Sequence, residues 1–155
     1  MSRNKLCAGA ALLALALSMA GCGLGNPTAG ITNGVGKARA ARAVSSLQQA
    51  LITASVVTGD SGGAGGAALA TELQSRDPSN RYTTALPTEP GTIQVVGGGG
   101  EPLMLVTSAA GSGGGAAYVA AFKEGTSTLW YAGDQAPLYT TGQPTQPGWS
   151  ATPPQ

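Results

Sequence analysis

Hydrophobic residues recur with a helical period between residues 37 and 57. Their spacing alternates between four and three positions, which places them on one face of an α-helix: Ala40, Val44, Leu47, Leu51 and Ala54. The residues of the opposite face are polar: Arg39, Arg42, Ser46, Gln49 and Thr53. Gly59 follows the last periodic residue and is typical of a helix C-terminus. The pattern predicts one N-terminal amphipathic helix, with Leu47 and Leu51 buried at its centre.

The pattern becomes that of β-strands after residue 92. Four short runs rich in β-branched and aromatic residues are separated by glycine tracts or a turn: 92–96, 103–108, 117–122 and 128–132. A second, shorter helix is expected before them, at Ala67–Gln74. Because short connections favour antiparallel pairing, we expect a four-stranded antiparallel sheet with one buried face. The amphipathic helix would cover that face, which gives an α+β architecture.

A further apolar run lies near the start of the chain. Arg3 and Lys5 precede an uncharged segment, Cys7–Leu17, and small residues then lead to Cys22. This order is typical of a secretory signal. The apolar segment is too short to span a bilayer, which needs about 20 apolar residues.

The end of that segment, Met19-Ala20-Gly21-Cys22, resembles the lipobox of bacterial lipoproteins. The resemblance implies cleavage between Gly21 and Cys22 and a diacylglycerol on the Cys22 thiol. Residues 1–21 would then be the signal peptide, and residues 22–36, rich in Gly, Asn, Pro and Thr, a flexible tether. The protein would be anchored by lipid to the extracytoplasmic face of a cell membrane. The alternative is an ordinary signal peptide that happens to contain a cysteine.

Composition restricts the chemistry of the remaining chain. Arg3 and Lys5 leave with the signal, so six basic residues face seven acidic ones, a formal charge of −1. No basic patch is left for nucleic-acid binding. The chain has no histidine, and its two cysteines are Cys7 in the signal and Cys22 in the lipobox, so no disulfide is expected. Residues 135–155 contain five prolines and are predicted to be a disordered tail.

The order of elements over residues 37–134 resembles the globular head of type IV pilins and pseudopilins. Ala40–Gly63 is similar to the end of the long pilin helix with the Gly/Asp-containing loop that follows it. A short helix, Asp77-Pro78 and a strand region ending in Leu129-Trp130-Tyr131 come next. The resemblance implies a pilin-like α+β domain at 37–134. The hydrophobic first helix of pilins is missing here, and Cys22 with its tether stands in its place.

Two glycine-rich stretches look like catalytic or cofactor motifs. Gly59-Asp60-Ser61-Gly62-Gly63 matches the nucleophile loop of chymotrypsin-like serine proteases, but Ser61 has no histidine to serve as its base. Gly63–Ala68 fits G-x-G-x-x-A, but a helix precedes it where a dinucleotide site requires a strand. The first stretch is therefore interpreted as a flexible loop at the end of a helix, and the second as a chance match in a glycine-rich chain.

The carboxylates are scattered along the chain, mostly at turns: Asp60, Glu72, Asp77, Glu89, Glu101, Glu124 and Asp134. None is paired for acid–base catalysis or for a calcium loop. We therefore expect no catalytic, cofactor-binding or metal-binding residues, and no cofactor.

The sequence thus favours a non-enzymatic, membrane-anchored surface lipoprotein that acts in protein contacts or envelope structure. Its partners would be the membrane, through Cys22, and envelope, pilus or secretion-system proteins. The alternative is a lipoprotein that binds a small ligand or solute. An aromatic cavity would favour that alternative, with a lining drawn from Tyr118, Phe122, Trp130 and Tyr131.

Overall fold

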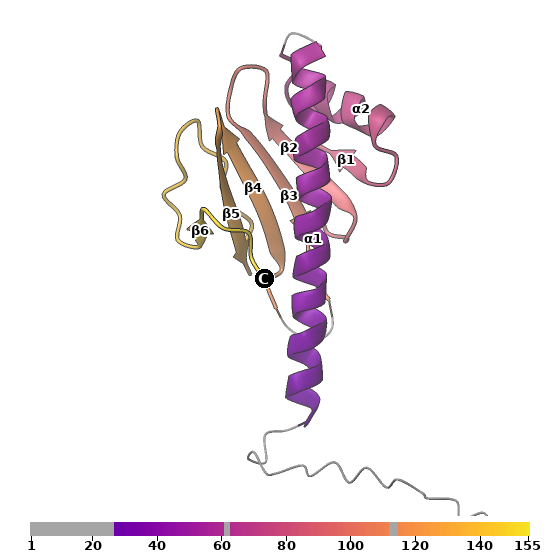
Figure 1. Ribbon diagram of the computed structural model, residues 1–155, viewed down its shortest axis with the longest axis vertical. Helices are drawn as coiled ribbons and strands as arrows, with labels where there is room; N and C mark the ends of the chain where they lie inside the picture. The colour runs from indigo at the N-terminus through magenta and orange to yellow at the C-terminus, as the bar shows by residue number, and fades with distance from the viewer. Residues whose placement is uncertain (1–26, 61–62, 112–114) are drawn as a thin grey trace, which may run out of the picture.

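The computed structural model describes residues 27–60, 63–111 and 115–155, and the side chains of helix α1 from residue 34 onward. This part of the chain is α+β, with two helices and a six-stranded mixed sheet (Figure 1). The elements are α1 (Pro27–Asp60), α2 (Gly66–Arg76), β1 (Arg81–Thr83), β2 (Thr92–Gly97), β3 (Leu103–Ser108), β4 (Tyr118–Glu124), β5 (Ser127–Gly133) and β6 (Trp149–Ser150).

The strands lie in the sheet in the order of the sequence, β1 to β6. Strands β2 to β5 form the expected antiparallel meander, with Leu105 opposite Ala121 and Ala121 opposite Trp130. The prediction of a four-stranded antiparallel sheet is nevertheless wrong. Strand β1 adds to one edge in parallel with β2, and β6 adds to the other edge antiparallel to β5.

Neither edge strand could be predicted from the sequence pattern, because both are too short. Strand β1 has three residues and β6 has two, so neither shows the alternation that identifies a strand. Parallel neighbours also usually need a crossover of a dozen or more residues, and the connection from β1 to β2 spans only residues 84–91.

Helix α1 begins at Pro27, ten residues before the predicted start, so the expectation of a flexible tether is wrong for residues 27–36. Proline is tolerated in the first helical turn, where its missing N–H has no intrahelical partner. Glycines at 30, 34 and 36 disfavour a helix locally, but extending an existing helix adds one hydrogen bond per residue ordered. Figure 1 shows this first part of α1 extending beyond the sheet.

The buried face of α1 is rotated relative to the predicted one. Its fully packed residues are Ala43, Val44, Leu47, Ala50, Ala54 and Val57. Leu47 is buried as expected, whereas Leu51 is only partly buried and Ala50 occupies the core position. Ile52 and Val56 are 62% and 50% exposed on the outer side. The helix as a whole is therefore not the clearly amphipathic element that was expected.

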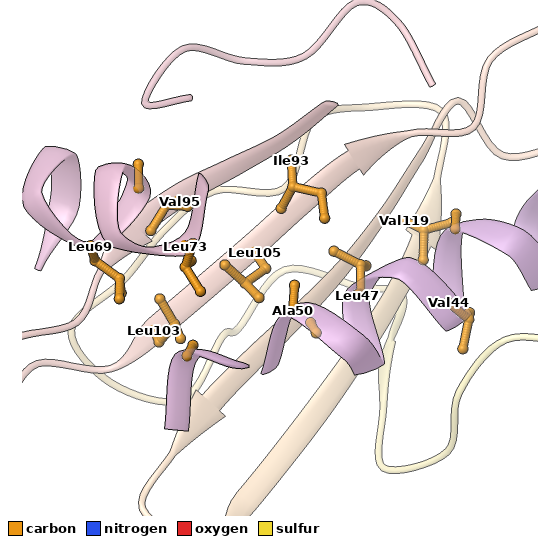
Figure 2. Packing of buried hydrophobic residues seen from close by; sticks show 14 of the residues in the cluster. Val44, Leu47, Ala50, Leu69, Leu73, Ile93, Val95, Leu103, Leu105 and Val119 are labelled. Carbon is orange, nitrogen blue, oxygen red and sulfur yellow. The ribbon is translucent and has the colours of Figure 1, made fainter. Parts of the chain in front are cut away.

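The main core lies between the two helices and one face of the sheet. Figure 2 shows Leu47 and Ala50 of α1 and Leu69 and Leu73 of α2 converging on the aliphatic side chains of β2, β3 and β4. These four helix residues are completely buried. Full burial of a leucine contributes about 2 kcal/mol, so this cluster is the main source of stability.

A second core lies on the opposite face of the sheet. Met104, Val106, Phe122 and Tyr131 are buried there beneath the segment that follows β5. Trp149 of that segment contacts Tyr131 and Phe122, with ring centroids 5.4 and 6.0 Å apart. The prediction of a disordered tail at 135–155 is therefore wrong. The segment is ordered because a few aromatic anchors outweigh its proline-rich composition.

Glycines allow the loop before α2 to touch the turn between β2 and β3. Gly65 forms an isolated β-bridge with Gly98, and a Cβ at Gly65 would lie 2.8 Å from the Gly98 carbonyl oxygen. Gly97, with φ of 76°, is equally restricted, because a Cβ there would lie 2.0 Å from the Pro102 carbonyl oxygen. The glycine tracts thus serve close backbone packing.

Candidate functional site

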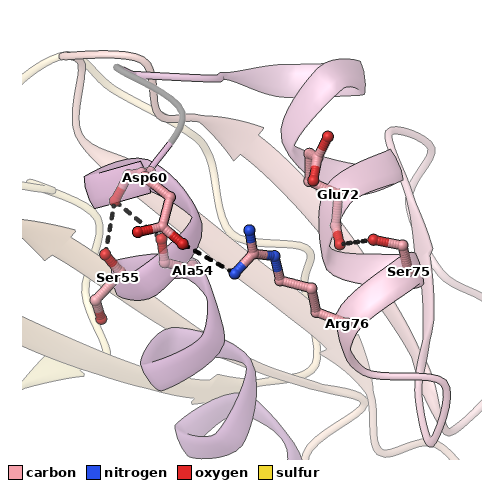
Figure 3. A network of polar contacts seen from close by, with 7 residues as sticks. Ala54, Ser55, Asp60, Glu72, Ser75 and Arg76 are labelled. Carbon is pink, nitrogen blue, oxygen red and sulfur yellow. Dashed lines mark hydrogen bonds and ion pairs between the residues drawn. The ribbon is translucent and has the colours of Figure 1, made fainter.

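The residues of the predicted lipidation site, Gly21 and Cys22, lie outside the described part of the chain, as do Ser61 and Gly62 of the protease-like loop. Asp60, beside that loop, ends α1 and forms an ion pair with Arg76 of α2, with Oδ2 and Nη1 3.1 Å apart (Figure 3). The two side chains are 60% and 40% exposed, so the pair contributes little to stability. Its role is to join the C-terminal ends of the two helices.

The G-x-G-x-x-A stretch, Gly63–Ala68, contains the start of α2. Gly65 precedes this helix and Gly66 begins it, and Gly65 packs directly against the β2–β3 turn. The backbone of the stretch is therefore occupied by contacts within the protein. Its glycines are explained by this packing.

The carboxylates do not gather into a site that could hold a metal ion. Within the described residues, no three His, Cys, Asp or Glu side chains lie close enough together to do so. Asp77 differs from the other carboxylates because it is buried, with 6% of its surface exposed. The sequence placed it with the other carboxylates, mostly at turns, without indicating that it is buried.

Asp77 organises the loop between α2 and β1. Its carboxylate accepts hydrogen bonds from the Ser79 N–H (3.1 Å) and hydroxyl, from the Asn80 amide (2.9 Å) and from the Tyr82 hydroxyl (2.6 Å). Burial alone would raise the pKa of Asp77, but these donors together lower it to about 2. Burial, together with the bond to Asp77, raises the pKa of Tyr82. The cluster is a structural lock that holds the loop in one conformation.

The aromatic residues that were candidates for a ligand cavity are packed within the fold. Trp130 belongs to the main core, and Phe122 and Tyr131 belong to the second core, with Tyr118 packed against it. None of the four lines a described cleft. The proposed aromatic ligand cavity is thus not found among the described residues.

A cleft of about 460 Å³ opens beside this loop. Its lining includes Arg39, Arg42 and Ser46 of α1, Asn80 of the locked loop and Ser108 at the end of β3. The sequence pattern placed Arg39, Arg42 and Ser46 together on the polar face of the helix. Their shared face was recognised, but the loop and strand end that enclose it are brought there only by the tertiary fold.

In the described part of the chain, neither helix has the length and apolar character needed to cross a membrane. Comparisons with protein-family models, curated proteins and solved structures find no match for this chain.

Proposed function

We propose that this protein is a lipid-anchored surface protein of the extracytoplasmic side of a membrane, acting through protein contacts and without catalysis. The observation that carries the proposal is the stretch Met19-Ala20-Gly21-Cys22 after a charged and then apolar segment. Cleavage before Cys22 and lipidation of its thiol would place the anchor five positions before Pro27, where α1 begins.

The shape of the molecule supports a role in display. Helix α1 has 34 residues and is about 50 Å long at 1.5 Å per residue. Among its side chains from residue 34 onward, the first that is fully packed is that of Ala43, sixteen residues after Pro27. The first half of α1 would therefore hold the sheet away from the lipid. One long helix that carries a sheet is also the arrangement suggested by the resemblance to pilin heads, here with lipid in place of the hydrophobic helix.

Contacts rather than catalysis are favoured by the residues available. The chain has no histidine, and Asp60 beside Ser61 is paired with Arg76. On α1, Ile52 and Val56 lie one turn apart and are largely exposed, which provides apolar area suited to a protein partner. The solute-binding alternative was tied to an aromatic cavity, and the four aromatic residues concerned pack inside the fold instead.

The anchor is tested by Cys22→Ser in cells fed with labelled palmitate. We expect labelling to disappear and processing of the signal to stop, because the thiol is the acylated group. Two acyl chains hold a protein firmly, since each buried CH₂ contributes about 0.8 kcal/mol. The unmodified protein should therefore fractionate with membranes.

Cys7→Ser is the matched control, because it removes the other thiol of the chain and should leave labelling unchanged. Label that persists in Cys22→Ser would contradict the proposed anchor. Loss of label in both variants would contradict it as well, since the effect would then not be specific to the lipobox.

A further inference from the structure

We propose that the cleft between α1, the α2–β1 loop and the end of β3 binds a small molecule carrying a carboxylate or phosphate group. This anion site goes beyond the proposed function and does not depend on the lipid anchor. Its volume of about 460 Å³ lies within the range of small-molecule sites. The guanidinium of Arg42 is the group expected to hold the anion.

The cleft carries positive charge without a carboxylate in its lining. Arg39 and Arg42 lie three positions apart on α1, and like charges at this spacing repel each other on a helix. Arg42 is exposed and forms no hydrogen bond or ion pair with any described residue. An anion bound at Arg42 would satisfy the donors of its guanidinium.

Arg39 is held at the edge of the cleft by its packing. It is half-buried, and a Cβ at Gly111 would lie 2.0 Å from its Nη1 atom. A side chain at position 111 would require the guanidinium, the flexible end of Arg39, to shift. Gly111 therefore leaves room for Arg39 beside the cleft.

A hydroxyl on the same helix face is left available. Other helical hydroxyls of this protein donate to the carbonyl four residues earlier, as Ser45 does to Ala41 and Ser55 to Leu51. Ser46 lines the cleft and makes no such bond within the described residues. Its proton is free to be donated to a bound oxyanion.

Ser108, at the end of β3, supplies a second hydroxyl to the cleft lining. Ser108 is 3% exposed, and its oxygen accepts a hydrogen bond from the Ala110 N–H at 3.3 Å. Among the described residues, no acceptor is found for the Ser108 proton. Arg42, Ser46 and Ser108 thus line one cleft with donors that lack an acceptor, the arrangement that an oxyanion requires.

The nearby acidic residue does not supply that acceptor. Asp77 is absent from the lining, and its carboxylate already accepts bonds from Ser79, Asn80 and Tyr82. The hydrogen bonds to Asp77 therefore fix the loop that forms one wall of the cleft. They also occupy the oxygens of the Asp77 carboxylate.

The test is a titration of the full chain, in an uncharged detergent at pH 7, with sodium phosphate and separately with sodium acetate. Sodium chloride at equal ionic strength is the reference, and the readout is the NMR shifts of amides around Ser46, Gly91 and Ser108. We expect saturable shifts at these positions. Tighter binding of phosphate or of acetate identifies which of the two groups the cleft prefers.

Arg42→Gln should weaken this binding about tenfold, since a charge-assisted hydrogen bond is lost. Lys37→Gln is the matched control, because Lys37 is exposed on the same helix, carries the same charge and lies outside the cleft. Equal weakening in both variants would show binding to general surface charge and would overturn the proposal. The absence of saturable shifts with both anions would overturn it too.

Discussion

The carboxylate of Asp77 shows how one side chain fixes a loop. Asp77 is charged and almost fully buried, and it is satisfied by donors from Ser79, Asn80 and Tyr82 within the next five residues. The α2–β1 connection therefore keeps its conformation without a large apolar core of its own. A buried charge is tolerated when hydrogen bonds replace its hydration in this way.

Because the charged form of Asp77 is held by these hydrogen bonds, we expect the free energy of unfolding to fall at acid pH. The pKa of Asp77 is about 2 in the folded state, against 3.8 for an unperturbed group. Its contribution of about 2 kcal/mol is therefore present above pH 4 and is lost as the pH falls from about 4 to 2. Urea denaturation should show that Asp77→Asn removes this part of the pH dependence and lowers stability at pH 7.

Asp134→Asn is the matched control, because it removes an exposed carboxylate of the same type. The variant should retain the pH profile of the unmodified protein. Identical profiles for the protein with and without the Asp77 carboxylate would show that its hydrogen bonds do not stabilise the fold.

Some residue-level features could be predicted from sequence and others could not. Leu47 was placed in the core because a period of 3.6 fixes the side of a helix that carries most apolar residues. Leu51 was predicted to be buried, but it is only partly buried, and Ala50 occupies the core position instead. The reason is that packing on the sheet sets the final rotation of the helix. The cleft around Arg42 depends on residues up to 67 positions away in the chain, which no local pattern connects.

At the scale of elements, α1 has two parts with different surroundings. The part from Ala43 onward packs on the sheet, while the part that begins at Pro27 extends past it (Figure 1). Strands β2 to β5 could be predicted because each is long enough for its apolar residues to show a pattern. The start of α1 could not, because residues 27–36 have the composition of a linker and become helical by extension from the packed half.

The packing of α1 can be tested with leucine and isoleucine truncations. Leu47→Ala should lower the free energy of unfolding by about 2–5 kcal/mol, because the side chain is completely buried against the sheet. Leu51→Ala should have a smaller effect, since Leu51 is partly exposed. Urea denaturation followed by circular dichroism gives both values.

Ile52→Ala is the matched control for these two variants, because Ile52 is 62% exposed on the same helix. Its truncation should change stability by less than about 0.5 kcal/mol. An effect of Leu51→Ala as large as that of Leu47→Ala would mean that α1 is rotated from the position described.

At the scale of the whole molecule, the sheet is covered on both faces. The helices cover one face, and the segment after β5 covers the other, with Tyr139 donating a hydrogen bond to the Pro102 carbonyl oxygen at 2.9 Å. A two-sided sheet could not be deduced from composition, because residues 135–155 contain only two aromatic residues among many prolines and polar residues.

Trp149 is expected to be the main anchor of this covering segment. Trp149→Ala should destabilise the protein by about 3 kcal/mol, because the indole packs against Tyr131 and Phe122. Urea denaturation measures the loss. Leu138→Ala, at a position 69% exposed in the same segment, should leave stability unchanged. Comparable losses in both variants would argue against Trp149 as the anchor.

The position of Trp149 in the chain also determines when the protein can finish folding. A chain is synthesised from its N-terminus, so Phe122 and Tyr131 emerge before the residue that covers them. Until then one face of the sheet stays bare, and the partly made chain cannot reach its stable state. In the proposed lipoprotein, this delay would keep the polypeptide from completing its fold while it is being synthesised.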